Sequence, residues 1–288
     1  MKTTLTVSSA EETAMAIDVE ILCIGNELLI GKIKDTNAHY LAKQATQLGA
    51  NVKRVTIIQD IVEEIAKAVN EALVRKPQFI ITTGGLGPTF DDKTLQGIAR
   101  ALNRKLEVNP NALETVKQKC LEYAKKRGFP TEIELTPPRI KMATLPERTK
   151  VVNNPVGTAP GVRVDVEGTI LFSLPGVPIE TEAIFNETIA PLIKQAVGSS
   201  IFCERSIFAD NIMESRLSPL IDKVMSENEG VYVKSHPMRT ENKPHVELHL
   251  TLIADQGLNP AEKLIKAARQ LGVLVEANGG VVTFGFEG

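Results

Sequence analysis

The stretch Phe79–Thr94, FIITTGGLGPTFDDKT, decides the fold. It opens with the run Phe79–Ile81, which is apolar, rich in β-branched side chains and typical of a buried parallel strand. The glycine-rich run Gly84–Pro88 predicts a turn, and a helix is expected to begin at about Asp91. The apolar face of that helix would consist of Leu95, Ile98, Ala99 and Leu102. The stretch therefore predicts a strand, a glycine turn and a helix in succession.

The glycine turn has the composition of an anion-binding loop. Glycines let a backbone approach a ligand closely, and a helix start offers N–H groups to an anion. Neither G-x-G-x-x-G nor Gly-Lys-Ser/Thr is completed after Gly85. Instead Asp91 and Asp92 stand where a phosphate alone would be repelled, and a divalent cation between carboxylates and phosphate would resolve that conflict. The alternative is an ordinary N-cap with acidic residues in the first turn, which needs neither three glycines nor both acids.

Composition excludes several classes of partner. The 288 residues are 43% hydrophobic and 24% charged, as in an ordinary globular protein of one large or two modest domains. A net charge of −2 gives no basic field for nucleic acid or an anionic membrane, and no apolar run has the length of a membrane span. Cys23, Cys120 and Cys203 are widely separated and are expected to be reduced thiols in a cytoplasmic protein.

Upstream of the glycine turn, strands and helices alternate. Val19–Ile24 and Val52–Ile58 are predicted strands, a helix begins around Asp35, and Asp60 can cap the next helix. Such alternation predicts a parallel sheet, whose ligands bind beyond the carboxyl ends of the strands. The run Gly25-Asn26-Glu27, Asp60 and the glycine turn should all meet there.

Downstream, the pattern continues with a helix over Pro110–Arg127 and a turn-rich loop over Asn153–Gly161. A hairpin joins Val162–Val166 to Thr169–Leu174, and the turn Pro175-Gly176 leads into a helix that ends near Val197. A Pro-Gly turn by itself is as often a simple connection between two elements as a ligand contact.

Four motifs in this order resemble the CinA family. They are Gly25-Asn26-Glu27-Leu28-Leu29 with Asp35-Thr36-Asn37, Thr83–Thr89 with Asp91-Asp92, Asn154–Gly161, and Leu174–Glu180. The resemblance implies a three-layer α/β/α, mostly parallel fold like that of the molybdopterin-binding MogA/MoaB proteins. It also implies divalent-metal-dependent hydrolysis of ADP-ribose to AMP and ribose 5-phosphate. Many relatives add a C-terminal nicotinamide-nucleotide deamidase domain, but the chain ends at Gly288 and we do not expect that activity.

The resemblance also implies a set of site residues. In the molybdopterin relatives, one acid after the second strand and one acid in the glycine loop are implicated in catalysis. Asp60 fits the acid after the second strand, and either Asp91 or Asp92 could be the acid of the glycine loop. We expect Glu27 to orient a water or to be structural, and Asp60, Asp91 and Asp92 to bind Mg²⁺, Mn²⁺ or Co²⁺. The alternative is a protein that binds a nucleotide or pterin without turnover. The expected ligand-binding residues are Gly25, Asn26, Asn37, Thr83, Gly84, Gly85, Leu86, Gly87, Pro88, Thr89, Asn154, Gly157, Pro175 and Gly176.

Three segments are expected along the chain: a leader over residues 1–18, the binding domain over 19–199, and a small α+β domain over 200–288. The last follows a β-α-β-β-α-β order that suggests a split-βαβ sandwich. His245, Glu247 and His249 share one face of a strand, and we favour a solvated face over a metal site. The segment Lys234–Pro237 ends a strand and could reach a ligand.

The sequence of the small domain also predicts that two copies of the chain associate. Domains of its size are marginal alone, and strand-forming sequence at its start and end could leave a sheet edge open. We therefore expect a homodimer, tested by light scattering over a dilution series. The alternative is a monomer whose edge is blunted by Lys234, Lys243 and the flanking prolines.

Overall fold

The structure is a computed structural model that describes residues 17–238 and 244–285. The predicted leader, residues 1–18, lies almost wholly outside the described residues. Its last two positions already belong to the fold, because Ile17 packs against the core and Asp18 begins the first strand.

The first sheet has six strands in the order β2-β1-β3-β8-β7-β6. The four strands from β2 to β8 run parallel, and β7 and β6 are added antiparallel. This arrangement confirms the predicted mostly parallel α/β sheet. The strands are β1 (Asp18–Ile24), β2 (Asn51–Ile58), β3 (Phe79–Thr83), β6 (Lys150–Val152), β7 (Gly161–Val166) and β8 (Thr169–Leu174).

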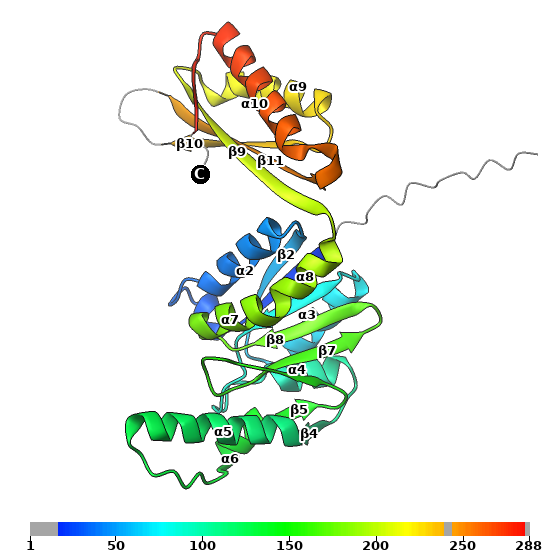
Figure 1. The fold of residues 1–288 in the computed structure, drawn as a ribbon, viewed down its shortest axis with the longest axis vertical. Helices are drawn as coiled ribbons and strands as arrows, with labels where there is room; N and C mark the ends of the chain where they lie inside the picture. The colour runs from blue at the N-terminus through cyan, green and yellow to red at the C-terminus, as the bar shows by residue number, and fades with distance from the viewer. Residues whose placement is uncertain (1–16, 239–243, 286–288) are drawn as a thin grey trace, which may run out of the picture.

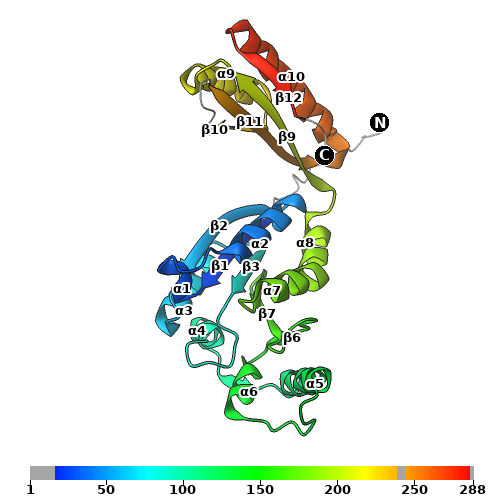
Figure 2. The same cartoon turned by 90° about the vertical axis from the view of Figure 1, so that its left-hand side faces the viewer.

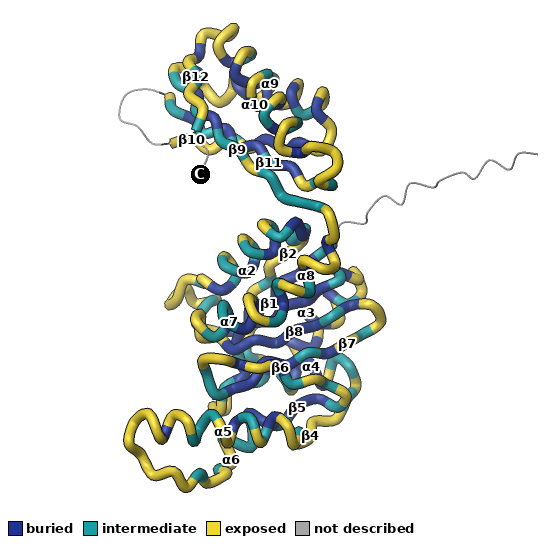
Figure 3. The backbone as a smooth tube through the Cα atoms, viewed as in Figure 1, coloured by how far each residue is buried: buried dark blue, intermediate teal, exposed yellow. Residues whose placement is uncertain are grey.

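Helices cover both faces of this sheet, giving three layers (Figures 1 and 2). The strands β1, β3 and β8 are buried along most of their length (Figure 3), and their side chains alternate between two buried clusters, one on each face. One face is covered by α2 (Thr36–Gln47), α7 (Pro178–Ile184), a π-helical turn (Phe185–Ile189) and α8 (Ala190–Val197). The other is covered by α3 (Val62–Val74), α4 (Thr94–Ala101), α5 (Pro110–Arg127) and α6 (Pro137–Met142). The short helix α1 (Asn26–Leu29) follows β1, and β4 (Leu106–Val108) pairs with β5 (Thr144–Pro146).

Two local predictions near the carboxyl edge are wrong. Helix α4 begins at Thr94 rather than near Asp91, because Asp91 and Asp92 turn back to bond Thr89 and so lie in the preceding loop. Asp60 does not cap α3. The N-cap is Ile61, without a side-chain bond, and the Asp60 carboxylate accepts a hydrogen bond from the Asn26 N–H instead.

The second sheet is antiparallel, in the order β10-β11-β9-β12, and its β-α-β-β-α-β order confirms the predicted separate α+β unit. Helices α9 and α10 cover one of its faces. The first strand of this unit, β9, is central in the sheet, whereas its last strand, β12, is an edge. The homodimer remains a prediction. The elements are β9 (Ser200–Asp210), α9 (Glu214–Glu227), β10 (Tyr232–Met238), β11 (His245–Asp255), a 3-10 turn (Gln256–Leu258), α10 (Pro260–Ala277) and β12 (Val281–Phe284).

The chain crosses from one sheet to the other at the start of β9 (Figure 1). A Cβ on Gly49, just after α2, would lie 2.9 Å from the Ser200 carbonyl oxygen, so the end of α2 touches the first residue of β9. None of the helices within the described ranges has the length and apolarity needed to cross a membrane.

Candidate functional site

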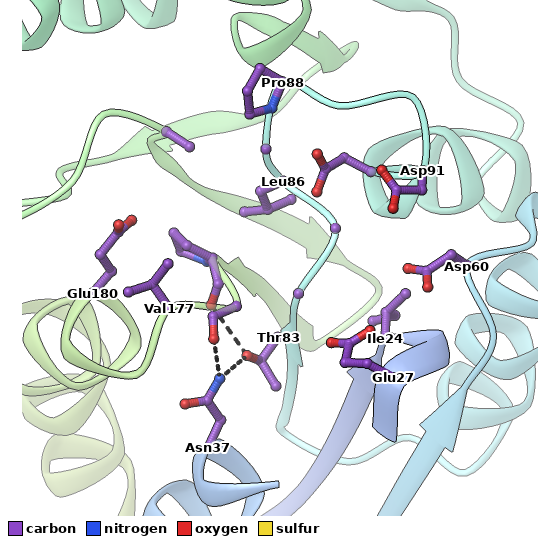
Figure 4. A pocket seen from close by; sticks show the side chains of 18 of the residues that line it. Ile24, Glu27, Asn37, Asp60, Thr83, Leu86, Pro88, Asp91, Val177 and Glu180 are labelled. Carbon is purple, nitrogen blue, oxygen red and sulfur yellow. Dashed lines mark hydrogen bonds between the residues drawn. The ribbon is translucent and has the colours of Figure 1, made fainter. Parts of the chain in front are cut away.

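A cavity of about 840 Å³ lies beyond the carboxyl ends of β1, β2 and β3 (Figure 4). Its volume is within the range of small-molecule sites. The structure therefore brings together the segments that the strand logic predicted to meet. The predicted site residues that line it are Gly25, Glu27, Asn37, Asp60, Thr83, Gly84, Gly85, Leu86, Gly87, Pro88, Asp91, Asp92, Pro175 and Gly176.

The glycine loop packs closely against the end of β1 and the start of α4. Gly84 and Gly85 have φ values of +98° and +66°, which favour glycine. A Cβ would lie 2.1 Å from the Ile24 carbonyl oxygen at Gly84 and 2.3 Å from Thr94 Oγ1 at Gly85. The Thr94 hydroxyl also donates to the Gly84 carbonyl, at 2.7 Å. No backbone carbonyl in the described ranges accepts from the N–H groups of residues 85–87, which leaves these donors for an anion.

Thr89 gathers the two aspartates of the loop. Its N–H and its hydroxyl both donate to Asp92 Oδ2, at 2.8 and 2.7 Å, and the hydroxyl also bonds Asp91 Oδ1. A Cβ on Gly87 would lie 2.6 Å from Asp92 Oδ2, so glycine there leaves room for the carboxylate. Thr89, expected to bind the ligand, instead holds the paired acids.

Asp60 faces three other carboxylates across the cavity (Figure 4). Burial raises the pKa of Asp60, and the charges of Glu27, Asp91 and Asp92 raise it further, against the opposing effect of its bond from the Asn26 N–H. The pKa of Asp91 is lowered, first by its bond from Thr89. Asp60 is therefore better placed to exchange a proton, and Asp91 to stay ionised.

The predicted metal trio does not form a closed cage. Across residues 17–238 and 244–285, no three His, Cys, Asp or Glu side chains are close enough to hold a metal ion. Asp91 and Asp92 nevertheless converge on one hydroxyl, and Mg²⁺ commonly uses one or two carboxylates together with substrate phosphates. The residues fit a divalent ion that is shared with a phosphate ligand.

Asn37 links the residue before the glycine loop, Thr83, to the turn Pro175-Gly176 on the other side of the cavity. Its amide nitrogen donates to Thr83 Oγ1 at 3.0 Å and to the Gly176 carbonyl at 2.8 Å, and Thr83 donates to the Pro175 carbonyl at 3.2 Å. A Cβ on Gly176 would lie 3.3 Å from the Gly84 Cα, so the two turns are in close contact. These predicted ligand residues set the width of the cavity.

Asn154 and Gly157 are not among the residues that line the cavity. Asn154 is fully buried; it donates to Glu180 Oε2 at 2.7 Å and to the Ala159 carbonyl at 2.8 Å. Its oxygen accepts from the N–H groups of Val156 and Gly157. The pair therefore shapes the loop that presents Ala159 to the cavity and joins that loop to Glu180 of α7, a structural part in place of the predicted contact.

Sequence reasoning missed the wall supplied by α5, α6 and the segment between them. Cys120, Arg139 and Met142 are among its lining residues. Behind the glycine loop is a smaller cavity of about 320 Å³ that Lys141 lines. Cys120 lies 32 residues beyond Pro88 in the sequence and Met142 lies 54 beyond it, and no local motif connects these positions to the glycine loop.

On β11, His245, Glu247 and His249 lie on the half-exposed face of the second sheet. Val246, Leu248 and Leu250 are buried, and the other face is paired across strands. His245 Nδ1 lies 2.7 Å from Asp210 Oδ1, and His249 Nε2 lies 3.2 Å from Glu204 Oε2. Glu247 accepts from the Ser206 hydroxyl at 2.6 Å. The segment Lys234–Pro237 lies in β10 and lines none of the cavities described here.

Comparison with known proteins places these features in a family. A model described as a probable molybdopterin binding domain matches residues 20–195. An Aeropyrum pernix protein is 41% identical over 264 residues, 91% of this chain and 95% of the relative. A Metallosphaera sedula protein is 39% identical over 259 residues, with 89% and 93% covered. The crystal structure of the protein CinA of unknown function from Thermoplasma acidophilum is 36% identical, covers 62% of this chain and 98% of its own, and has a TM-score of 0.54.

Proposed function

The chain belongs to the probable molybdopterin-binding domain family and is CinA-like, and from that premise we propose that its cavity hydrolyses the pyrophosphate of a nucleotide sugar, ADP-ribose above all. The observation that carries the proposal is the meeting, in one cavity, of a glycine loop whose N–H groups have no backbone acceptor in the described ranges with the carboxylates of Glu27, Asp60, Asp91 and Asp92. A pterin or nucleotide held without turnover needs the loop but not the carboxylates.

In this proposal the loop binds the pyrophosphate. The N–H groups of residues 85–87 donate to phosphate oxygens, and the missing side chains at Gly84 and Gly85 let the backbone come close. Asp91 and Asp92 would hold a divalent ion, which when bound would neutralise phosphate charge and lower the pKa of an attacking water.

Asp60 acts as the base in this reaction. A water oxygen forms a bond to one phosphorus while the bond from that phosphorus to the bridging oxygen breaks, and the bridging oxygen leaves on the other phosphate. The water's proton passes to Asp60, whose pKa is raised by burial and by its acidic neighbours, and Glu27 orients the water. One water is consumed, and AMP and ribose 5-phosphate are released.

The test is incubation of the purified protein with ADP-ribose and Mg²⁺, Mn²⁺ or Co²⁺, with chromatographic detection of AMP. We expect equal amounts of AMP and ribose 5-phosphate, formed only with a divalent ion. If ADP-ribose binds in calorimetry but no AMP is formed, the result supports a protein that binds its ligand without turnover. If ADP-ribose is neither bound nor hydrolysed, the nucleotide sugar is excluded as the ligand.

A further inference from the structure

Lys141 reaches the glycine loop from behind. Its ammonium group donates to the Thr89 carbonyl and lies 3.5 Å from the Gly87 carbonyl oxygen. The side chain lines the smaller cavity on the far side of the loop and is not among the residues lining the main cavity. Lys141 therefore contacts the backbone that carries the aspartates, not the space where a ligand would lie.

The contact falls on the residue that organises the paired acids. The N–H and hydroxyl of Thr89 bond Asp91 and Asp92, and its carbonyl accepts from Lys141. All three polar groups of Thr89 are thus engaged: the N–H and the hydroxyl by the carboxylates, and the carbonyl by the ammonium together with the Asp92 N–H at 3.3 Å. Fixing this carbonyl fixes the direction in which both carboxylates point.

The base of the lysine side chain is itself fixed. Met142 and Ala143, the next residues, are 8% and 0% exposed in the core under the sheet. The Thr144 hydroxyl donates to the Ile140 carbonyl, closing the last turn of α6. Lys141 therefore extends from a rigid point to a loop more than fifty residues earlier in the chain.

We propose that Lys141 is a positioning residue, which holds the Gly87–Thr89 backbone so that Asp91 and Asp92 present their carboxylates to a phosphate-bound divalent ion. This inference rests on the proposed function. It predicts that the lysine matters through its hydrogen bonds to the loop, because its charge alone would compete with the ion for the same carboxylates.

The experiment compares Lys141→Met and Lys141→Arg with the matched control Lys93→Met. Lys93 also lowers the pKa of Asp91, and its side chain makes no capping hydrogen bond at the start of α4. Three quantities are measured: hydrogen exchange without ligand of the hydrogen-bonded loop amides of Gly84, Thr89 and Asp92, kcat with ADP-ribose, and Mn²⁺ affinity by electron paramagnetic resonance in the presence of AMP.

For Lys141→Met we expect loop amides to exchange at least tenfold faster, kcat to fall at least tenfold, and Mn²⁺ affinity to fall at least fivefold. Lys141→Arg should restore each to within threefold of wild type, and Lys93→Met should stay within twofold.

Unchanged exchange in Lys141→Met would overturn the inference, and so would tighter Mn²⁺ binding, which would make the lysine a competing cation. If the wild type hydrolyses no nucleotide sugar, the proposed function fails, while the exchange comparison still decides whether Lys141 holds the loop.

Discussion

Both sheets of this molecule present carboxylates at their surface, and the neighbours of those carboxylates differ. On the second sheet three acids have a partner on a neighbouring strand: Asp210 with His245, Glu204 with His249, and Glu247 with Ser206. At the edge of the first sheet, Glu27, Asp60, Asp91 and Asp92 face one another around a cavity that Lys34 and Arg139 also line, and Lys141 contacts the glycine loop from outside this cavity.

The difference distinguishes a candidate binding site from an ordinary polar surface in this chain. The acids of the second sheet have their charge or acceptor atoms satisfied by a neighbouring strand. In the cavity, burial and the charges of Glu27, Asp91 and Asp92 raise the pKa of Asp60, which favours a proton or a cation there. Four variants, taken from the largest expected effect to the smallest, test whether this contrast holds.

The double variant Asp91→Asn/Asp92→Asn should lower hydrolysis of ADP-ribose by about 10³-fold or more, since removing both carboxylates removes the ion's protein ligands. Asparagine is nearly isosteric, so the melting temperature should change little. The rate is measured at saturating Mn²⁺, with circular dichroism as the control for folding. Turnover near the wild-type rate would show that the paired acids bind no catalytic ion.

Asp60→Asn should lower kcat by about 10²-fold through loss of the base, and it should also stabilise the fold at neutral pH. The raised pKa of Asp60 means that its protonated form is favoured by folding; this contribution is complete below the ordinary value of 3.8 and is lost as pH rises through the folded-state pKa. Asparagine keeps an acceptor for the Asn26 N–H without the charge.

We expect the melting temperature of Asp60→Asn to rise by about 2 °C at pH 7. The gain should vanish near pH 3, where the wild-type carboxyl is protonated as well. Calorimetric melts at the two pH values measure it, and a variant less stable than wild type at pH 7 would contradict the assigned electrostatics.

Gly85→Ala should weaken binding of ADP-ribose by about tenfold and lower the melting temperature, because its Cβ would meet Thr94 Oγ1 at 2.3 Å. Gly128→Ala is the matched control. Its φ of +68° is close to the +66° of Gly85, but nothing lies within 4 Å of its Cβ position. Calorimetric titrations of both variants separate the cost of the backbone conformation from the cost of the contact. Equal affinities would mean that the loop tolerates a side chain.

His245→Ala should leave hydrolysis within twofold of wild type and cost about 0.5 kcal/mol of unfolding free energy. The change removes a cross-strand pair with Asp210 and a ring stacked on Phe208 at 5.6 Å, far from the cavity. Urea melts and the AMP assay measure the two effects. A large loss of turnover would show that the second sheet also takes part in the reaction.

Much of the architecture was predictable because it rests on local patterns. The run Phe79–Ile81 is a buried strand, α5 has the predicted bounds, and the β-α-β-β-α-β order of the second unit follows from alternating apolar runs. Convergence of Glu27, Asp60 and the glycine loop followed from the rule that parallel strands end at one edge.

The rest depended on partners that are distant in sequence. Asp60 looked like a helix cap, but its partner is the Asn26 N–H in another segment. Asn154 looked like a ligand contact because its buried bond to Glu180 cannot be read from spacing. Lys141 carried no signal, since no periodicity relates α6 to the loop that it touches.

Helix α2 joins the two halves of the molecule mechanically. At its first turn, Asn37 bonds Thr83 and the Gly176 carbonyl in the wall of the cavity. At its other end, Gly49 abuts Ser200, where β9 begins. A helix of 12 residues is a rod about 18 Å long that bends little. One short rigid element therefore spans the distance from the cavity wall to the junction between the two units.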